Sequence, residues 1–277
     1  MCGITGCIIK RGVPESAVLA QAAAQLQHRG PDDQGVHIAG PVGLGHTRLS
    51  VIDLAGGHQP ICSLDGRYAL VANGEIYNHV ELRAALQGLG CVFQTESDSE
   101  AILHAWDRSA LDGVRQLHGM FAFALHDMAA GELVLGRDRL GIKPLFYAVL
   151  PDRVVFGSEI KALLPLMPAR PGICPEALLQ FLQNQFSSGR DTVFTPTRGL
   201  NGRLEYRNYD ESWGSDFDFD HFGASLHHHT PFGQYSSLGL RLDGEAVWQG
   251  GSGVLVSVTL PEDPRTGEGK AAAQNAI

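Results

Sequence analysis

The second residue of the chain is a cysteine, and its position suggests a nucleophile. The chain begins MCGITGC, and an initiator methionine is readily removed when the next residue is as small as cysteine. The processed chain would then carry a thiol and a free α-amine on one residue. Because the ordinary pKa of a thiol is about 8.5 and that of an α-amine about 7.7 to 8.0, the amine can accept the thiol proton. Cys2 is therefore a candidate nucleophile with its own base, although its position alone fits a small core residue equally well.

An Asn-Gly pair follows the predicted strand 68–74 and could bind a developing negative charge. The side-chain amide of Asn73 and the backbone N–H of Gly74 can converge on one oxygen, as the oxyanion hole of an acyl-transfer site requires. Taken alone, the pair is better explained by a type I′ hairpin turn, for which Asn-Gly is the strongest short signal.

Two charged residues complete a set that suits a free amino acid. Arg48 follows a predicted strand and can bind an α-carboxylate, and Asp98 lies near a predicted helix start and can bind an α-ammonium group. Each alone is more typical of a solvated or capping charge. Together with Cys2 and the Asn-Gly pair, they fit a substrate such as glutamine, whose side-chain amide would lie at the thiol.

Composition excludes several other classes of protein. The chain has 277 residues, 44% of them hydrophobic, and a formal net charge of −9 with no run of Lys and Arg, which argues against a nucleic-acid partner. The apolar stretch Ile4 to Ile9 is too short for a membrane span or a secretory core, so we expect no membrane association. The cysteines form no C-x-x-C pair, so neither a zinc ribbon nor a disulfide framework is indicated and the expected compartment is a reducing cytoplasm.

The expected elements are many short strands and a few helices. We expect helices over 16–28, ended by a left-handed Gly30 and by Pro31, over 79–90, from a capping box of Ser97 and Glu100 onward, and over 175–186. Strands are expected over 4–9, 42–46, 49–54, 68–74, 120–127, 132–138, 144–149 and 153–159, those over 120–149 as an antiparallel meander. This pattern predicts an α+β fold with a two-sheet core and helices outside.

Several other residues are better explained by structure than by chemistry. Phe121, Phe123 and Leu125 alternate as one buried strand face, and Gly141 with Pro144 indicates a turn. His46 and His79 flank the candidate residues, but a mechanism that uses the α-amine as base needs neither of them, so we interpret both as ordinary polar residues.

Eight motifs in order give the chain a family resemblance. Between residue 2 and about residue 195 it resembles the glutaminase domain of class II glutamine amidotransferases, in particular that of glutamine-dependent asparagine synthetase. The motifs are MCGITG, HRGPDDQG, GHTRLSVIDL, NGEIYNH, TESDSEAILHAW, LHGMFAFALHD, GRDRLGIKPLFY and FGSEIKALL.

The resemblance implies a fold, a site and a reaction. The fold would be the four-layer αββα sandwich of the N-terminal-nucleophile hydrolases, and the reaction the hydrolysis of glutamine to glutamate and ammonia with Cys2 as nucleophile. Asp98 would hold the α-amine of glutamine. The residues implied to line the glutamine site are Arg48, Leu49, Ser50, Val51, Ile52, Asn73, Gly74 and Glu75. No cofactor is implied for this reaction; ATP and Mg²⁺ would enter only with a partner synthetase, and the expected partners are a separate synthetase chain or a second copy.

Residues 201–277 depart from the family pattern. Asparagine synthetases continue into a domain marked by a phosphate-binding S-G-G-x-D-S loop, and these 277 residues contain no such string. We therefore expect a glutaminase domain over 2–200 and a divergent tail with two strands, near 238–248 and 253–260, and a disordered end. A metal site in the tail is not favoured, because the spacing of its acidic and histidine residues matches no standard motif. These residues are Asp216, Asp218, Asp220, His221 and His227 to His229.

Two other functions remain open from the sequence. One is a glutamine-binding or scaffold module without turnover, which the intact set of Cys2, Arg48, Asn73 and Asp98 argues against. The other is a hydrolase of the same fold that acts on peptides or lactams, which the Arg48 and Asp98 pair makes less suitable than a free amino acid.

Overall fold

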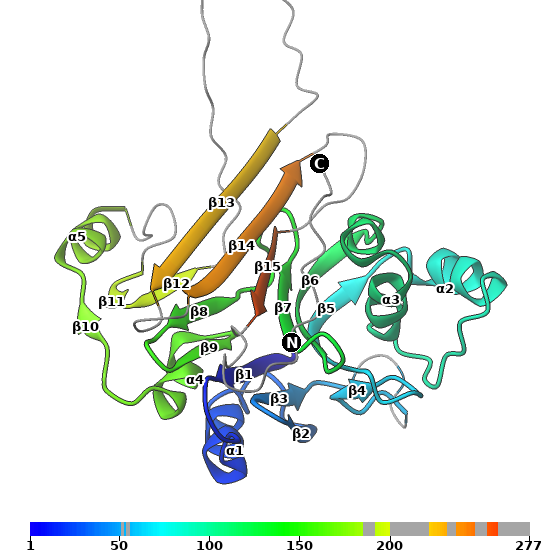
Figure 1. The fold of residues 1–277 in the computed structure, drawn as a ribbon, viewed down its shortest axis with the longest axis horizontal. Coiled ribbons are helices and arrows are strands. Elements are labelled where there is room, and N and C mark those ends of the chain that lie inside the picture. Colours follow the sequence, from blue (N-terminus) through cyan, green and yellow to red (C-terminus); the bar gives the residue numbers. More distant parts are fainter. Residues whose placement is uncertain are drawn as a thin grey trace, which may run out of the picture.

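Two antiparallel β-sheets lie face to face, with helices on the outer face of each (Figure 1). The structure is a computed structural model that describes residues 1–50, 53, 56–184, 192–199, 222–231, 237–246 and 254–259. For the last three of these ranges, only the backbone is described. The layers therefore follow the order helix, sheet, sheet, helix, which confirms the predicted αββα sandwich.

The first sheet has six strands and carries the N-terminal residues in its middle. Its order is β12 (Thr197–Gly199), β8 (Phe146–Val149), β9 (Arg153–Gly157), β1 (Gly3–Ile9), β3 (Val42–Arg48) and β2 (Asp33–Ala39). β1 pairs antiparallel with both of its neighbours, so that Gly3 lies opposite Thr47 and Thr5 opposite Gly157. The start of β1 is thereby fixed next to the end of β3.

The second sheet has seven strands, and strands from the C-terminal region extend it. Its order is β13 (Phe222–Pro231), β14 (Ser237–Ala246), β15 (Val254–Thr259), β7 (Glu132–Arg137), β6 (Gly119–Asp127), β5 (Tyr68–Ile76) and β4 (Ile61–Cys62). β15 pairs antiparallel with β7, with Val254 opposite Arg137. A small separate sheet joins β10 (Gly172–Ile173) to β11 (Phe194–Thr195).

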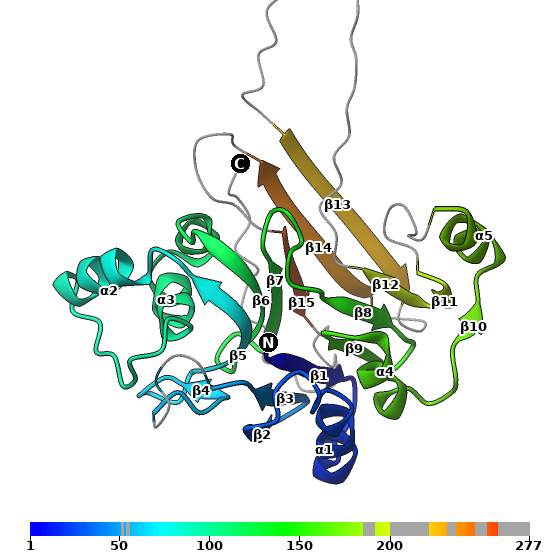
Figure 2. The same ribbon diagram turned by 180° about the vertical axis from the view of Figure 1, so that it is seen from behind.

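Helices cover both outer faces (Figure 2). The first sheet packs on α1 (Ser16–Ala24), α4 (Ile160–Leu163) and the short 3-10 helix η1 (Leu164–Leu166). The second sheet packs on α2 (His79–Gly88) and α3 (Glu100–Arg115). A further helix, α5 (Pro175–Asn184), follows β10. Among the described helices, none has the length and apolar character that a membrane span requires.

The core between the sheets follows from the alternation of side chains along each strand. Ile4 and Ile8 of β1 and Val71 of β5 are fully buried in it. The other face of β6 bears Phe121, Phe123 and Leu125, which pack against the helices, as the sequence predicted. Each sheet thus buries apolar residues on both faces.

The first helix is shorter than predicted. α1 ends at Ala24, turns follow over 25–29, and Gly30 has no positive φ, so the expected left-handed cap is wrong. A Cβ at Gly30 would lie 2.4 Å from the carbonyl carbon of Thr47 and 2.5 Å from the nitrogen of Arg48. Glycine is therefore needed there because the loop passes directly against the end of β3.

The capping box is also wrong. α3 begins at Glu100 with Ser99 as its N-cap, and the carboxylate of Glu100 accepts hydrogen bonds from the N–H groups of Gln94 and Thr95 instead of Ser97. The hydroxyl of Ser97 instead accepts the N–H of Ser99.

Four strand predictions differ from the structure. β8 does not continue a meander with β6 and β7 but lies in the other sheet beside β9. Of the expected strand 49–54, the described residues Leu49, Ser50 and Asp53 are not in a strand. β2 and β13 lie where no strand was expected. The two strands predicted in the tail are present as β14 and β15.

Histidine side chains lie in the space between the sheets. His46 of β3 is 1% exposed, and its Nε2 lies 3.1 Å from the carbonyl oxygen of Ala72 in β5. Burial lowers its pKa to about 4. His126 of β6 is 3% exposed, and burial together with nearby His37 lowers its pKa to about 4 as well. Within the described part of the chain, Nδ1 of His46 and of His126 has no hydrogen-bond partner.

These histidines predict that the fold loses stability in mild acid. An unfolded histidine binds a proton near pH 6.5, whereas His46 and His126 stay neutral in the fold until about pH 4, so the unfolded state binds more protons between these values. The free energy of unfolding should therefore fall through this window, by on the order of 3 kcal/mol per histidine. Urea unfolding at a series of pH values measures it.

A pair of variants assigns the acid effect to the buried imidazoles. His126→Leu should reduce the loss of stability on acidification, whereas replacement of the exposed His118 by Gln should leave it unchanged. Equal acid dependence of His126→Leu and the parent protein would contradict the assignment.

Candidate active site

Cys2 lies at the start of the central strand of the first sheet. Gly3 pairs with Thr47, which brings Cys2 next to Arg48 at the end of β3. The half-buried thiol donates a hydrogen bond to the carbonyl of Leu49, with Sγ 3.8 Å from the oxygen. A nucleophile at this position is held by strand pairing on its C-terminal side and remains accessible from the strand end.

Arg29 holds the backbone of Cys2, and the chemistry inferred from the sequence did not include it. Its Nε donates to the carbonyl of Cys2 over 3.0 Å, and its Nη1 donates to Glu159, which follows β9, over 2.9 Å. Burial alone would raise the pKa of Glu159, but hydrogen bonds from Arg29, His28 and Lys161 outweigh it and lower that pKa. Glu159 therefore stays ionised and orients Arg29. Arg29 lies in the motif HRGPDDQG and Glu159 in the motif FGSEIKALL. The sequence therefore contained both residues in recognised motifs, but it indicated no role for either of them.

Arg48 ends β3 with only 4% of its surface exposed. Its guanidinium donates to the backbone carbonyl of Asp53, and its own carbonyl accepts the N–H of Asp32 over 3.0 Å. Asp32 in turn accepts the N–H of Ser50 through its carboxylate over 2.7 Å. Two further residues of the predicted substrate-binding stretch are thus placed by contacts: Leu49 through its carbonyl at the Cys2 thiol, and Ser50 through its N–H at Asp32. Val51 and Ile52 lie outside the described residues.

Asn73 and Gly74 lie inside β5, not in a turn. The strand runs to Ile76, with Asn73 opposite Ala122 and Gly74 opposite Phe121, so the hairpin-turn interpretation is wrong. Asn73 is 1% exposed, and its Nδ2 has no hydrogen-bond partner among the described residues. Because an unpaired buried amide costs about 1 to 3 kcal/mol, such a group calls for a ligand or another explanation.

Asp98 is a buried carboxylate beside the end of β5. It is 4% exposed, and its Oδ2 accepts the N–H of Ile76 over 2.7 Å. Burial raises the pKa of Asp98, while the hydrogen bond from Ile76 and the charge of His79 oppose the rise. Exposed Glu75 adds to the rise, since its negative charge lies nearby. A cation bound at Asp98 would favour its ionised form.

The predicted residues come together at one end of the two sheets. The contact between His46 and Ala72 joins β3 to β5 two residues before Arg48 and one residue before Asn73. The hydrogen bond from Ile76 to Asp98 adds the carboxylate to the same strand end. The N-terminus lies beside β1 and β5 in both views (Figures 1 and 2). These contacts place the thiol, the unpaired amide, the cation and the anion on adjoining strands and on the segment that binds the end of β5, and their chemical roles stay predictions.

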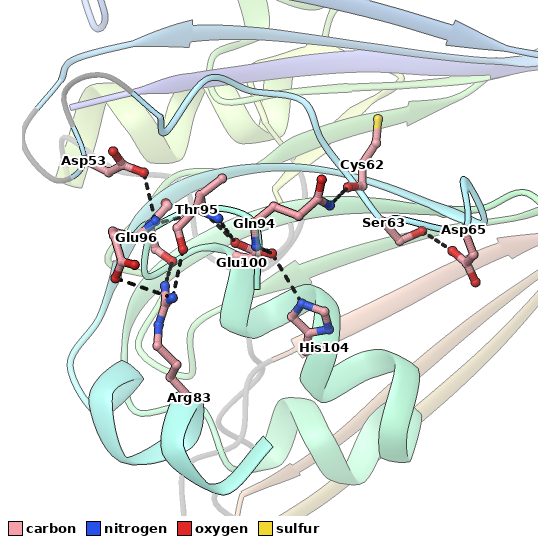
Figure 3. Close-up of polar contacts among 11 residues, drawn as sticks. Asp53, Cys62, Ser63, Asp65, Arg83, Gln94, Thr95, Glu96, Glu100 and His104 are labelled. Carbon is pink, nitrogen blue, oxygen red and sulfur yellow. Dashed lines mark hydrogen bonds and ion pairs between the residues drawn. The ribbon is translucent and has the colours of Figure 1, made fainter. Parts of the chain in front are cut away.

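The segment before Asp98 is held rigidly (Figure 3). Glu100, which is 1% exposed, accepts hydrogen bonds from the N–H groups of Gln94 and Thr95 over 2.7 and 2.8 Å and from the Thr95 hydroxyl over 2.6 Å. Arg83 donates to the carbonyls of Thr95 and Ser97. Burial would raise the pKa of Glu100, but hydrogen bonds from His104, Thr95 and Gln94 lower it to about 2. These buried charges fix the backbone that carries Asp98.

The comparison with protein families matches this geometry. A family model described as a glutamine amidotransferase domain matches residues 1–211. The chain belongs to this family. Within this amidotransferase domain, the motifs on which the resemblance rested contain all of the residues that the structure gathers at the strand ends.

The curated relatives of the chain that are described next are asparagine synthetases. The chain is 42% identical over 168 residues to asparagine synthetase (glutamine-hydrolysing) 2 of Bacillus subtilis (strain 168), which covers 59% of this chain and 22% of the relative. It is 38% identical over 190 residues to asparagine synthetase (glutamine-hydrolysing) 1 of the same organism, which covers 67% of this chain and 30% of the relative. It is 39% identical over 167 residues to asparagine synthetase (glutamine-hydrolysing) 3 of Arabidopsis thaliana, which covers 59% of this chain and 28% of the relative. The chain thus spans about a quarter of the length of these relatives.

Solved structures share the fold. A structure titled as the allosteric regulatory enzyme of purine biosynthesis matches with a TM-score of 0.51 and 25% identity over 60% of this chain and 43% of the other. The glutamine phosphoribosylpyrophosphate amidotransferase of B. subtilis matches with a TM-score of 0.50, 24% identity and the same coverage. The amidotransferase domain therefore has the sandwich fold of the N-terminal-nucleophile amidotransferases.

The described residues of the amidotransferase domain contain no group of three or more His, Cys, Asp or Glu side chains arranged to hold a metal ion. The acidic tail residues Asp216, Asp218, Asp220 and His221 lie outside the described residues, and the side chains of His227 to His229 are not described.

The strand position of Gly74 predicts that it tolerates no side chain. A Cβ at this residue would lie 2.1 Å from the carbonyl oxygen of Met120 and 2.6 Å from the Cα of Phe121. Because these are backbone atoms, Gly74→Ala should lower the free energy of unfolding by roughly 1 to 3 kcal/mol, measured in urea. Gly88 at the end of α2 is a matched control, since nothing lies within 4 Å of a Cβ there. A Gly74→Ala protein as stable as the Gly88→Ala protein would contradict the prediction.

Proposed function

We propose that the chain hydrolyses glutamine to glutamate and ammonia and that the ammonia serves amide transfer. The observation that carries the proposal is the amide of Asn73, which is buried and has no partner among the described residues, in the strand that the His46–Ala72 contact joins to β3 and that Asp98 binds at Ile76. A scaffold that only binds glutamine has no use for a thiol beside such an amide.

Recognition of the substrate rests on two opposite charges. Arg48 binds the α-carboxylate of glutamine and Asp98 binds its α-ammonium group, which suits a free amino acid better than a peptide or lactam. Both charges are held by backbone groups at the strand ends, so they are in place before the substrate arrives. The side-chain amide then extends toward Cys2.

The first chemical step forms a thioester. The α-amine of processed Cys2 takes the thiol proton, and the thiolate attacks the amide carbon of glutamine. The amide of Asn73 and the N–H of Gly74 donate hydrogen bonds to the oxyanion that forms. The α-ammonium group then gives its proton to the leaving nitrogen, the carbon–nitrogen bond breaks, and ammonia departs.

The second step releases glutamate. The α-amine of Cys2, now neutral, takes a proton from water, and the resulting hydroxide attacks the thioester carbon. The carbon–sulfur bond breaks, and the thiolate takes the proton back. The oxyanion donors serve both steps, and the reaction as written needs no metal or cofactor.

The relatives suggest where the ammonia goes. They carry the name asparagine synthetase (glutamine-hydrolysing), and this chain covers only about a quarter of their length. We therefore propose a cytoplasmic synthetase, as a further domain or a separate chain, as the ammonia acceptor and the place where ATP and Mg²⁺ act. A homodimer remains the alternative partner.

The nucleophile is tested by replacing its thiol. Cys2→Ala should abolish glutamate formation, by at least about a thousandfold in kcat, because it removes the thiol that forms the thioester. Exposed Cys62 provides a control, since Cys62→Ala removes a thiol away from the site and should leave the rate unchanged. Glutamate release by the Cys2→Ala protein at the parent rate would refute the assignment.

The base is tested by keeping Met1 in place. When Met1 is retained, the nitrogen of Cys2 belongs to a peptide bond and cannot accept a proton, so hydrolysis should fall as far as in Cys2→Ala. Intact mass identifies the processed and unprocessed forms, and a glutamate assay of each measures the difference. Equal rates for the two forms would show that another group is the base.

Substrate recognition is tested at the two charges. Arg48→Ala should leave the substrate carboxylate unpaired in a partly desolvated site and lower kcat/KM at least about a hundredfold, and Asp98→Asn should act similarly through the ammonium group. Because burial raises the pKa of Asp98, kcat/KM of the parent protein should also fall on acidification before an ordinary aspartate would protonate, and Asp98→Asn should lose this dependence. Parent-like hydrolysis of N-acetylglutamine would contradict the role of Asp98.

A further inference from the structure

We propose that Asp53 is a positioning residue that connects Arg48 to the backbone carrying Asp98, so that the two substrate charges are held as one unit. This inference rests on the proposed hydrolysis of glutamine. It concerns a residue that touches neither the substrate nor Cys2 and acts through Arg48 and Glu96.

The backbone of Asp53 holds Arg48. Its carbonyl oxygen accepts hydrogen bonds from the Arg48 guanidinium and from the N–H of Gly57, the latter over 3.0 Å. A Cβ at Gly57 would lie 2.4 Å from Nη2 of Arg48 and 3.0 Å from the carbonyl oxygen of Asp53. A side chain at Gly57 would therefore displace the guanidinium, which shows that Gly57 lies directly against it.

The backbone conformation of Asp53 is unusual and directs that carbonyl. Its φ is +50°, a left-handed conformation that few residues other than glycine, asparagine and aspartate adopt. Within the described residues, only Ala110 among the other non-glycine residues has a positive φ. A conformation of this kind persists where surrounding contacts over-determine it.

The carboxylate of Asp53 provides those contacts. Its Oδ1 accepts the N–H of Gly56 over 2.8 Å, and its Oδ2 accepts the N–H of Glu96 over 2.9 Å. The second bond spans 43 residues of sequence and appears in Figure 3 as the connection from the loop to the segment before α3. One carboxylate thus stabilises its own backbone conformation and attaches it to the backbone two residues before Asp98.

The far side of this connection does not move freely. Glu96 is flanked by Thr95, whose N–H and hydroxyl bind Glu100, and by Ser97, whose carbonyl accepts a hydrogen bond from Arg83. Asp53 therefore attaches the guanidinium of Arg48 to a rigid segment. The distance between the cation for the α-carboxylate and the anion for the α-ammonium is fixed, which gives the site its selectivity for a free amino acid.

Asp53→Gly tests the coupling. Glycine adopts the positive φ without strain but removes both carboxylate bonds, so the amide of Glu96 should exchange hydrogen faster in mass spectrometry of the segment 94–98. KM for glutamine should rise about tenfold with kcat nearly unchanged, since ground-state and transition-state binding are lost equally. The preference for glutamine over both glutaminamide and N-acetylglutamine should decrease.

Asp53→Asn and Asp65→Gly complete the experiment. Asparagine tolerates the same φ and keeps an acceptor for one of the two N–H groups, so it should give an intermediate effect, and it decides the question if the glycine variant does not fold. Asp65→Gly removes carboxylate bonds to Ser63 and Arg67 away from the site and should change neither KM nor the substrate preference.

The outcomes separate this inference from the proposed function. Unchanged hydrogen exchange over 94–98 and unchanged KM in the Asp53 variants, with an active parent protein, would overturn the coupling alone. A fall in kcat without a change in KM or substrate preference would overturn it too. A parent protein that hydrolyses no glutamine would refute the function, while faster exchange in Asp53→Gly would still support the connection between the loop and the segment 94–98.

Discussion

The packing of the two β-sheets against each other is the constraint on which the site depends. Apolar residues of β1, β3 and β5 fill the space between the sheets. The hydrogen bond between His46 and the carbonyl of Ala72 joins the two sheets, two residues before β3 ends at Arg48. A strand that is paired on both edges and packed on both faces has little freedom to shift. Cys2 before β1, Arg48 at the end of β3 and buried Asn73 within β5 are therefore fixed relative to one another although they are far apart in the sequence.

Charges buried beside this core are stabilised by backbone groups more than by each other. Asp98 accepts the N–H of Ile76, Arg48 donates to the carbonyl of Asp53, and Glu100 accepts the N–H groups of two residues. Backbone partners offset part of the desolvation cost without neutralising the charge. Arg48 and Asp98 thus remain able to bind opposite charges on a ligand. Burial disfavours the ionised form of Asp98, which is why its pKa is raised.

Local patterns in the sequence predicted the strands whose apolar and polar residues alternate. They failed for features that depend on contacts between residues far apart in the sequence. The buried face of Phe121, Phe123 and Leu125 follows from its period alone, and the two-sheet core was predicted from the many short strands and few helices. The sheet to which β8 belongs could not be predicted, because pairing with β9 depends on the whole fold. The same holds for Gly30, whose neighbours Thr47 and Arg48 are distant in sequence, and for Arg29, whose role requires Glu159 to lie beside Cys2.

Asn73 and Gly74 show how a site can contradict a local rule. Asn-Gly strongly favours a hairpin turn, yet β6 pairs with both residues and keeps them in a strand. Gly74 is required because the backbone of β6 leaves no space for a Cβ, and Asn73 buries an amide that no described residue satisfies. Packing explains the glycine but not the amide, since an apolar residue in the place of Asn73 would avoid the cost of an unpaired donor. A conflict between local preference and fold that packing does not resolve is expected at functional sites, and here it lies in the strand that His46 joins to β3, the neighbour of β1.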